Sequence, residues 1–342
     1  MNSSRKKIFF GILSLLVLLI ICVSGFLYYQ IFVSQFCISN TASLYIDTDD
    51  NIDSVQIKMI RAANPKNVVG FDILYKVRPF QVKTGHYCIA PTDNYHTVYR
   101  KLSQGLQTPI KVTVPSTRTL ERMAAILGRR LMCDSIDFIN VFKDTAIHRS
   151  MNYDTTTFVC LFIPNTYEMY WDVSVERFIQ RMKKEHSVFW NAERVGKAQQ
   201  IGLTEKEVCT LASIVDEETN YTPEKPNVAG MYMNRLKLGM PLQADPTVKF
   251  GLKMFGLRRI YNHHLKVKSP YNTYINKGLP PGPIRVATIS GIDAVLNYGQ
   301  HQYLYMCANS DFSGSHIFAR TYREHLVNAR KYQQALNKRN IK

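Results

Sequence analysis

The chain has 342 residues, 46% of them hydrophobic and 20% charged, which provides enough apolar content for one large domain or two modest ones and excludes an intrinsically disordered protein. Its formal net charge of +17 favours an anionic partner, such as lipid headgroups, nucleic acid or a carboxylate-bearing polymer. The seven cysteines show no C-x-x-C spacing and no phosphate-binding loop occurs. We therefore expect no metal site and no cofactor, while disulfide pairing stays open.

The first 30 residues predict a membrane anchor. A basic cluster at residues 5–7 precedes an apolar run over residues 8–30 without a charged residue, and about 20 apolar residues span a bilayer as a helix. Lys and Arg are then absent as far as Gln56, so the positive-inside rule places residues 1–7 in the cytoplasm. A cleaved signal peptide is the alternative, but the run is longer than an ordinary signal core and lacks a clear cleavage site.

This predicted membrane topology limits which partners the protein can bind. It predicts a single-pass inner-membrane protein that contacts membrane lipid through its anchor and exposes everything after about residue 30 to the periplasm. A periplasmic domain meets no chromosome, so we expect no nucleic-acid partner despite the positive charge.

The exported part begins with a small module over residues 40–107. The apolar spacing predicts the order β-α-α-β, with a closing helix at residues 94–102. The strands are expected at 42–46 and 86–90, and the helices at 51–63 and 71–77. This order is similar to that of a LysM-type glycan-binding module.

Residues 108–342 are expected to form a mixed domain, so the predicted fold class is α+β. A strand is expected at 109–114. The region 134–197 is predicted to be mostly helical, with a proline-containing loop at 162–167. Two short strands at 303–308 and 316–319 precede a basic C-terminal helix at 322–338.

One helix in this domain carries an unusual carboxylate. Thr204 is a suitable N-cap with Glu207 as its capping-box partner, and the apolar residues Val208, Leu211 and Val215 follow at helical spacing. The same spacing reaches Glu218, whereas the two acidic residues before it, at 216 and 217, are predicted to point away from this apolar stripe.

Glu218 is expected at the end of the helix, because Asn220 and Pro223 are typical of helix termination. The negative end of the helix dipole and partial burial would both raise its pKa toward the range useful for a general acid. Periodicity alone leaves open that Glu218 is a solvated residue of a surface helix.

Residues 211–219 resemble the A-S-I-[IV]-E-x-E-T signature of the YceG-like endolytic murein transglycosylase family, with Asp216 in place of the first acidic residue. Three further ordered blocks agree: 234–236, then 242–248, then 271–274 with 278–284. Residues 83–87 match the K-x-G-x-Y pattern of the family's small module.

The resemblance implies an enzyme that cuts peptidoglycan glycan strands within their length. Glu218 would protonate the oxygen between N-acetylmuramic acid and N-acetylglucosamine and then deprotonate the muramoyl C6 hydroxyl, leaving a 1,6-anhydromuramoyl end. Such an enzyme would terminate strand growth alongside penicillin-binding proteins or other wall synthases.

Five more residues are candidates for substrate binding in these blocks: Gln243, Asp245, Asn272, Thr273 and Tyr274. Their amide, hydroxyl and carboxylate groups suit sugar hydroxyls and acetamides. Asp245 is also explained as a turn-forming residue before Pro246. The histidines, including His316 and His325, form no recognised ligand motif and are interpreted as surface or packing residues.

Two other functions stay open. A hydrolytic muramidase would use Glu218 with Asp245 as its pair of carboxylates. A non-catalytic wall-binding scaffold would bind glycan without needing the acid function of Glu218.

Overall fold

The computed structural model describes residues 3–257 and 259–339, without the side chains of residues 3–5. Residues 1–2 of the expected cytoplasmic segment and residues 340–342 of the expected catalytic domain therefore lie outside the described residues. The chain forms two compact units, Met1–Val112 with Glu168–Val173, and Thr113–Tyr167 with Ser174–Lys342. Both helices and strands are present, as the α+β class predicts.

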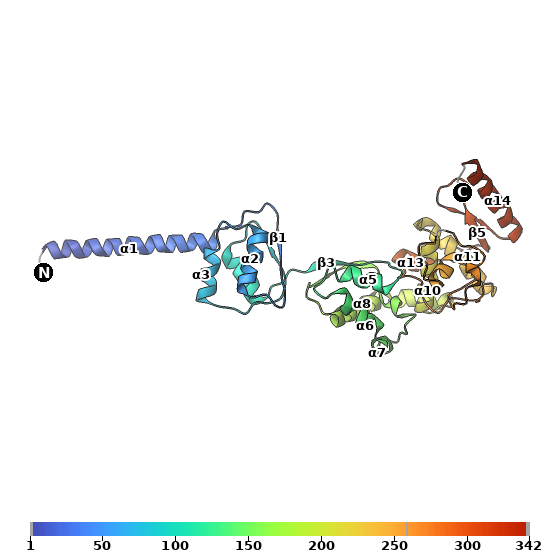
Figure 1. Cartoon of the computed structure of the whole chain (residues 1–342), viewed down its shortest axis with the longest axis horizontal. Coiled ribbons are helices and arrows are strands. Elements are labelled where there is room, and N and C mark those ends of the chain that lie inside the picture. The colour runs from blue at the N-terminus through green and yellow to red at the C-terminus, as the bar shows by residue number, and fades with distance from the viewer. Residues whose placement is uncertain (1–2, 258, 340–342) are drawn as a thin grey trace. The chain divides into compact units, whose positions relative to one another are not determined.

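The first unit begins with the long apolar helix α1 (Ser3–Phe32) (Figure 1). Its segment Lys6–Phe32 is long and apolar enough to cross a membrane, and its side chains are exposed from Lys6 to Tyr29. These properties are compatible with a membrane anchor or with a signal sequence. The end of α1 packs closely on the next helices, because a Cβ atom on Gly70 would lie 2.2 Å from the Gln30 carbonyl oxygen.

The rest of the first unit has the predicted β-α-α-β order. Strands β1 (Ala42–Ile46) and β2 (Gly85–Ile89) pair antiparallel, with Leu44 opposite Tyr87. Helices α2 (Ile52–Ala63) and α3 (Val69–Val77) lie between them in the chain, and α4 (Tyr95–Gln104) follows. Period-2 burial in β1 and helical burial in α2 bring their apolar side chains into one core.

Strand β4 (Asn165–Met169) corrects one prediction. The segment 162–167 was expected to be a loop, but its second half starts β4, which pairs with β3 (Ile110–Val114). The proline precedes the strand and so does not interrupt it. Tyr167 and Met169 are buried while Glu168 is exposed, which is the alternation of a half-buried strand.

The second unit is mainly helical. Its first part contains α5 (Leu120–Leu127), α6 (Ser135–Lys143), α7 (Thr145–Ser150), η1 (Phe158–Leu161), α8 (Val175–Phe189) and α9 (Ala192–Gln200). Its second part contains α10 (Glu205–Glu218), η2 (Thr222–Glu224), α11 (Lys225–Lys237), α12 (Asp245–Gly251), η3 (His264–Lys266) and α13 (Ile289–Leu296). The antiparallel pair β5 (Tyr305–Ala308) and β6 (His316–Ala319) precedes the final helix α14 (Tyr322–Lys338).

Helix α10 lies at the centre of this unit. It packs against α11, α12 and α13, and every residue from Val208 to Asp216 is buried. A helix buried all round has its backbone and its last residue fixed by neighbours on each side. The carboxylates at its C-terminal end are therefore held in defined positions.

Candidate active site

The N-terminus of α10 is formed by the predicted capping residues. Thr204 Oγ1 accepts a hydrogen bond from the Glu207 amide at 3.3 Å, and Glu207 Oε2 accepts one from the Thr204 amide at 2.8 Å. The helix ends at Glu218, with the extended residue Thr219 as its C-cap. The predicted position of Glu218 at the helix C-terminus is confirmed.

Glu218 lies in a cavity of about 340 Å³. Its Oε1 accepts a hydrogen bond of 2.6 Å from the Tyr232 hydroxyl on α11. Burial of the carboxyl raises its pKa from 4.5 to about 7, Asp245 adds to this rise, and the Tyr232 hydrogen bond opposes it. Near neutral pH the group is therefore present in both its protonated and its ionised form, which suits a general acid that later acts as a base.

Three of the predicted substrate-binding residues line this cavity: Gln243, Asp245 and Tyr274. The Tyr274 hydroxyl donates a hydrogen bond of 2.6 Å to Asp245 Oδ1. Gln243 has a positive φ of 52°, an uncommon conformation that its backbone bond to the Thr273 carbonyl, at 3.0 Å, helps to hold. These side chains are placed to contact a ligand that reaches Glu218.

The other two predicted residues, Asn272 and Thr273, are fully buried and do not belong to the cavity lining. Asn272 Nδ2 donates hydrogen bonds of 2.9 Å to the carbonyls of Leu265 and Val267. Thr273 Oγ1 accepts one of 3.0 Å from the Ala244 amide. These side chains satisfy buried backbone groups, so the structure gives both residues a supporting position outside the cavity lining, where we expected a substrate contact.

Two histidines that were not predicted as site residues, His316 and His325, also line the cavity. His316 on β6 binds the buried carboxylate of Glu224. Its Nδ1 lies 2.9 Å from Oε2, and its backbone amide donates a hydrogen bond of 2.6 Å to Oε1. His325 on α14 stacks on Tyr305, with 5.5 Å between the ring centroids. These contacts agree with the interpretation of both as packing residues, but a strand pair and a helix about 100 residues beyond α10 also bring them to the Glu218 cavity.

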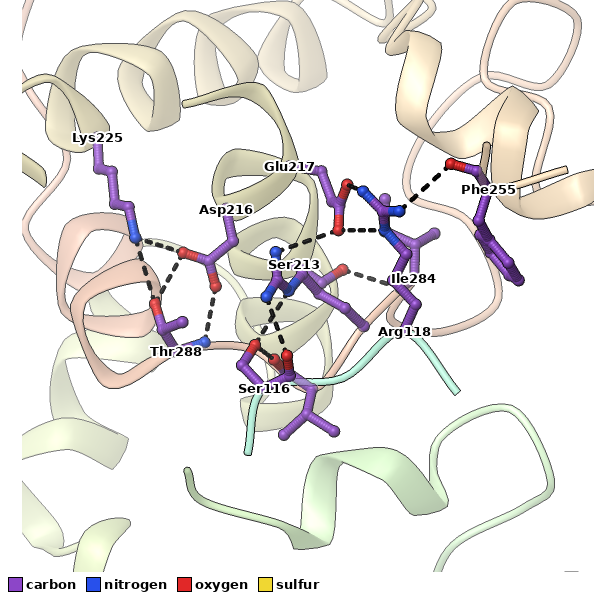
Figure 2. Close-up of polar contacts among 11 residues, drawn as sticks. Ser116, Arg118, Ser213, Asp216, Glu217, Lys225, Phe255, Ile284 and Thr288 are labelled. Carbon is purple, nitrogen blue, oxygen red and sulfur yellow. Dashed lines mark hydrogen bonds and ion pairs between the residues drawn. The ribbon is translucent and has the colours of Figure 1, made fainter. Parts of the chain in front are cut away.

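The neighbouring carboxylate Asp216 is more deeply buried than Glu218 and has a structural partner. Lys225 Nζ lies 2.6 Å from Asp216 Oδ1, with side-chain exposures of 7% and 1%. Asp216 also accepts hydrogen bonds of 2.7 Å from the backbone amide and the hydroxyl of Thr288 (Figure 2). Asp216 is buried although it was predicted to point away from the apolar stripe, because α10 has no solvent-facing side at this position.

Glu217 is likewise held by basic residues. Arg118 donates two hydrogen bonds to its two oxygens, at 2.8 and 2.6 Å (Figure 2). Arg285 donates a third hydrogen bond at 3.1 Å. Of the three consecutive acidic residues at the end of α10, only Glu218 lacks a cationic partner among the described ion pairs and lines the cavity. Within the described ranges, no group of three or more His, Cys, Asp or Glu residues could hold a metal ion.

Two known proteins have sequences similar to this chain. An endolytic murein transglycosylase of Bacillus subtilis (strain 168) is 34% identical over 168 residues, which are 49% of this chain and 46% of that protein. An endolytic murein transglycosylase of Streptococcus pneumoniae (strain ATCC BAA-255 / R6) is 23% identical over 299 residues, covering 77% of this chain and 53% of the relative. The chain thus spans about half the length of these curated relatives.

A solved structure agrees in fold. The crystal structure of a YceG-like protein from Listeria monocytogenes matches with a TM-score of 0.58 and 26% sequence identity, over 85% of this chain and 99% of that one. A family model described as the YceG-like family matches residues 44–331, which are most of the chain. The chain belongs to the YceG-like family.

Proposed function

We propose that this protein is a peptidoglycan lytic transglycosylase that cuts within glycan strands, with Glu218 as its catalytic residue. The observation that carries the proposal is the Glu218 carboxyl, which lies in a cavity and has a pKa raised to about 7. Membership of the YceG-like family and the names of the two relatives support the same reaction.

In the proposed mechanism, one carboxyl group performs both proton transfers. Protonated Glu218 gives its proton to the glycosidic oxygen as the bond from C1 of N-acetylmuramic acid to that oxygen breaks. Glu218, now ionised, removes the proton from the muramoyl C6 hydroxyl while that oxygen bonds to C1. The products are a free N-acetylglucosamine hydroxyl and a 1,6-anhydromuramoyl end, no water is consumed, and Glu218 is again protonated.

Three neighbours would assist these steps. The carboxylate of Asp245 lies in the same cavity and would stabilise positive charge that develops on the sugar ring. Its hydrogen bond from Tyr274 fixes its orientation. Gln243 supplies an amide for an acetamide or hydroxyl of the sugar. Because Asp245 is a second carboxylate near Glu218, hydrolysis by this pair is the alternative reaction, and its product would carry one additional water.

The cellular setting is part of the proposal. Residues 1–7 would lie in the cytoplasm, residues 8–30 would form a single inner-membrane anchor, residues 40–107 would form a LysM-like glycan-binding module, and residues 108–342 would form the periplasmic catalytic domain. The apolar helix α1 and the β-α-α-β order support this division. Acting beside penicillin-binding proteins, the enzyme would terminate the growth of glycan strands.

Activity measurements on Glu218→Gln test the catalytic assignment. We expect a loss of about 10²- to 10⁴-fold or more in the rate of strand cleavage, because an amide cannot transfer the required proton. Glu193→Gln on α9, which removes an exposed carboxylate, is the matched control and should retain activity. A folded Glu218→Gln protein with near wild-type cleavage would refute the assignment and favour a scaffold that binds glycan without cutting it.

A further inference from the structure

A second and larger cavity occurs in the same unit. Its volume is about 520 Å³, and its lining is separate from that of the Glu218 cavity. The lining combines basic and aromatic side chains: Arg118, Lys143, Lys253, Phe250, Phe255 and Tyr271. Nothing in the proposed proton transfers uses this cavity.

The two cavities are built from the same elements. Helix α12 contributes Asp245 to the Glu218 cavity and Phe250 to the second one, and five residues of α-helix span about 7.5 Å. The following loop contributes Tyr274 to the first cavity and Tyr271 to the second. The two cavities therefore border the same helix and the loop that follows it.

The charge of the second cavity favours an acidic ligand. Three basic side chains, Arg118, Lys143 and Lys253, oppose one carboxylate, Glu121. Lys143 and Lys253 are exposed, and neither takes part in an ion pair among the described residues. No described carboxylate therefore neutralises the two ammonium groups through an ion pair.

Arg118 is fixed in place but stays accessible. Glu217 holds its guanidinium from one side, and its Nη1 lies 3.4 Å from the Phe255 carbonyl oxygen (Figure 2). Its side chain nevertheless retains 44% exposure. Because Glu217 is shared with Arg285, one carboxylate serves two guanidinium groups and leaves net positive charge at this wall. A preorganised guanidinium loses little freedom when it binds a carboxylate.

We propose that this cavity binds the acidic peptide branch carried by the muramic acid residues of the strand. Carboxylates of the peptide would contact Lys143, Lys253 and Arg118, and its aliphatic parts would pack on the aromatic walls formed by Phe250 and Phe255. The inference rests on the proposed function for the identity of the strand. It predicts that the enzyme selects peptide-bearing strands over bare glycan.

Binding of a synthetic stem tripeptide to the full-length Glu218→Gln protein, measured by calorimetry, tests this proposal without bond cleavage. The probe carries free carboxylates, and its comparison is the same peptide with every carboxylate amidated. We expect the acidic peptide to bind roughly tenfold more tightly, from two or three partly exposed charge pairs. If the two peptides bind with equal affinity, their carboxylates make no contribution and the proposal is overturned. Stacking of uncharged groups on the aromatic walls would give that result.

Paired charge reversals locate the site. Lys143→Glu with Lys253→Glu should remove the preference for the acidic peptide. Lys183→Glu with Lys184→Glu makes the same charge change on exposed residues of α8 and should preserve the preference. If both double variants behave alike, the preference comes from general charge and the cavity assignment is wrong.

Cleavage assays separate this inference from the proposed function. In the unsubstituted protein, kcat/KM should be higher for peptide-bearing strands than for peptide-free strands, so that their ratio exceeds one. This ratio should fall in the double variant Lys143→Glu with Lys253→Glu. Anhydromuramoyl products with a ratio of one would overturn the inference and leave the proposed reaction intact. Peptide binding without any strand cleavage would support the inference about the cavity and refute the proposed reaction.

Discussion

Replacing Glu218 with Gln should stabilise the protein at alkaline pH while it removes catalysis. Burial raises the pKa of the folded-state carboxyl from 4.5 to about 7. Between these two pH values, the Glu218 carboxyl therefore stays protonated in the folded state, whereas it loses its proton in the unfolded chain. Stability of the unsubstituted protein must fall as pH rises from 4.5 to 7, and the full cost of ionising Glu218 is present above pH 7.

The size of this effect follows from the shift. A difference of about 2.5 pKa units corresponds to about 3 kcal/mol as an upper limit. Because the side chain is partly exposed to its cavity, we expect a gain of about 1–3 kcal/mol for Glu218→Gln above pH 7. Gln is nearly the same size as Glu, and its amide oxygen can still accept the hydrogen bond from Tyr232.

Calorimetric unfolding of the full-length protein in detergent, at pH 4 and at pH 8, measures this difference. We expect equal stability of the two forms at pH 4 and a more stable Glu218→Gln variant at pH 8. The exposed Glu193→Gln variant serves as the control. A Glu218→Gln variant no more stable than the unsubstituted protein at pH 8, or equally stabilised at both values, would refute the reasoning about the buried carboxyl.

Three other perturbations test separate parts of the account. Asp216→Asn should cost about 3–5 kcal/mol of stability in thermal unfolding, because it leaves the Lys225 ammonium buried without its counterion; unchanged stability would contradict this. Tyr232→Phe removes the hydrogen bond that lowers the pKa of Glu218, so the alkaline limb of the pH–rate profile should move to higher pH, and an unshifted limb would count against the Tyr232 contact. A reporter fused after Lys342 should be active only outside the cytoplasm, and cytoplasmic activity would reverse the proposed orientation.

Features set by neighbouring residues could be predicted from the sequence. The capping box of Thr204 and Glu207 and the end of α10 at Glu218 depend on contacts within four residues, so the sequence pattern contains them. The β-α-α-β order of the first unit likewise follows from the spacing of apolar residues.

Features set by distant residues could not be predicted. Helical phase places Asp216 away from the apolar stripe, but it contains no information about Thr288, which lies 72 residues later and binds that carboxylate. The polar character of Asn272 suggested a sugar contact, whereas the backbone carbonyls of its own loop use its amide. His316 comes to the Glu218 cavity through packing of the β5–β6 pair, which no local spacing specifies.

Mass spectrometry of the ends produced from purified long glycan strands tests the central claim most directly. The full-length protein should shorten long strands before any single disaccharide accumulates, and each new end should be a 1,6-anhydromuramoyl residue, one water lighter than a hydrolytic product. The Glu218→Gln protein should produce none of these ends. Reducing ends that carry the additional water, or anhydromuramoyl ends formed at an undiminished rate by Glu218→Gln, would contradict the account.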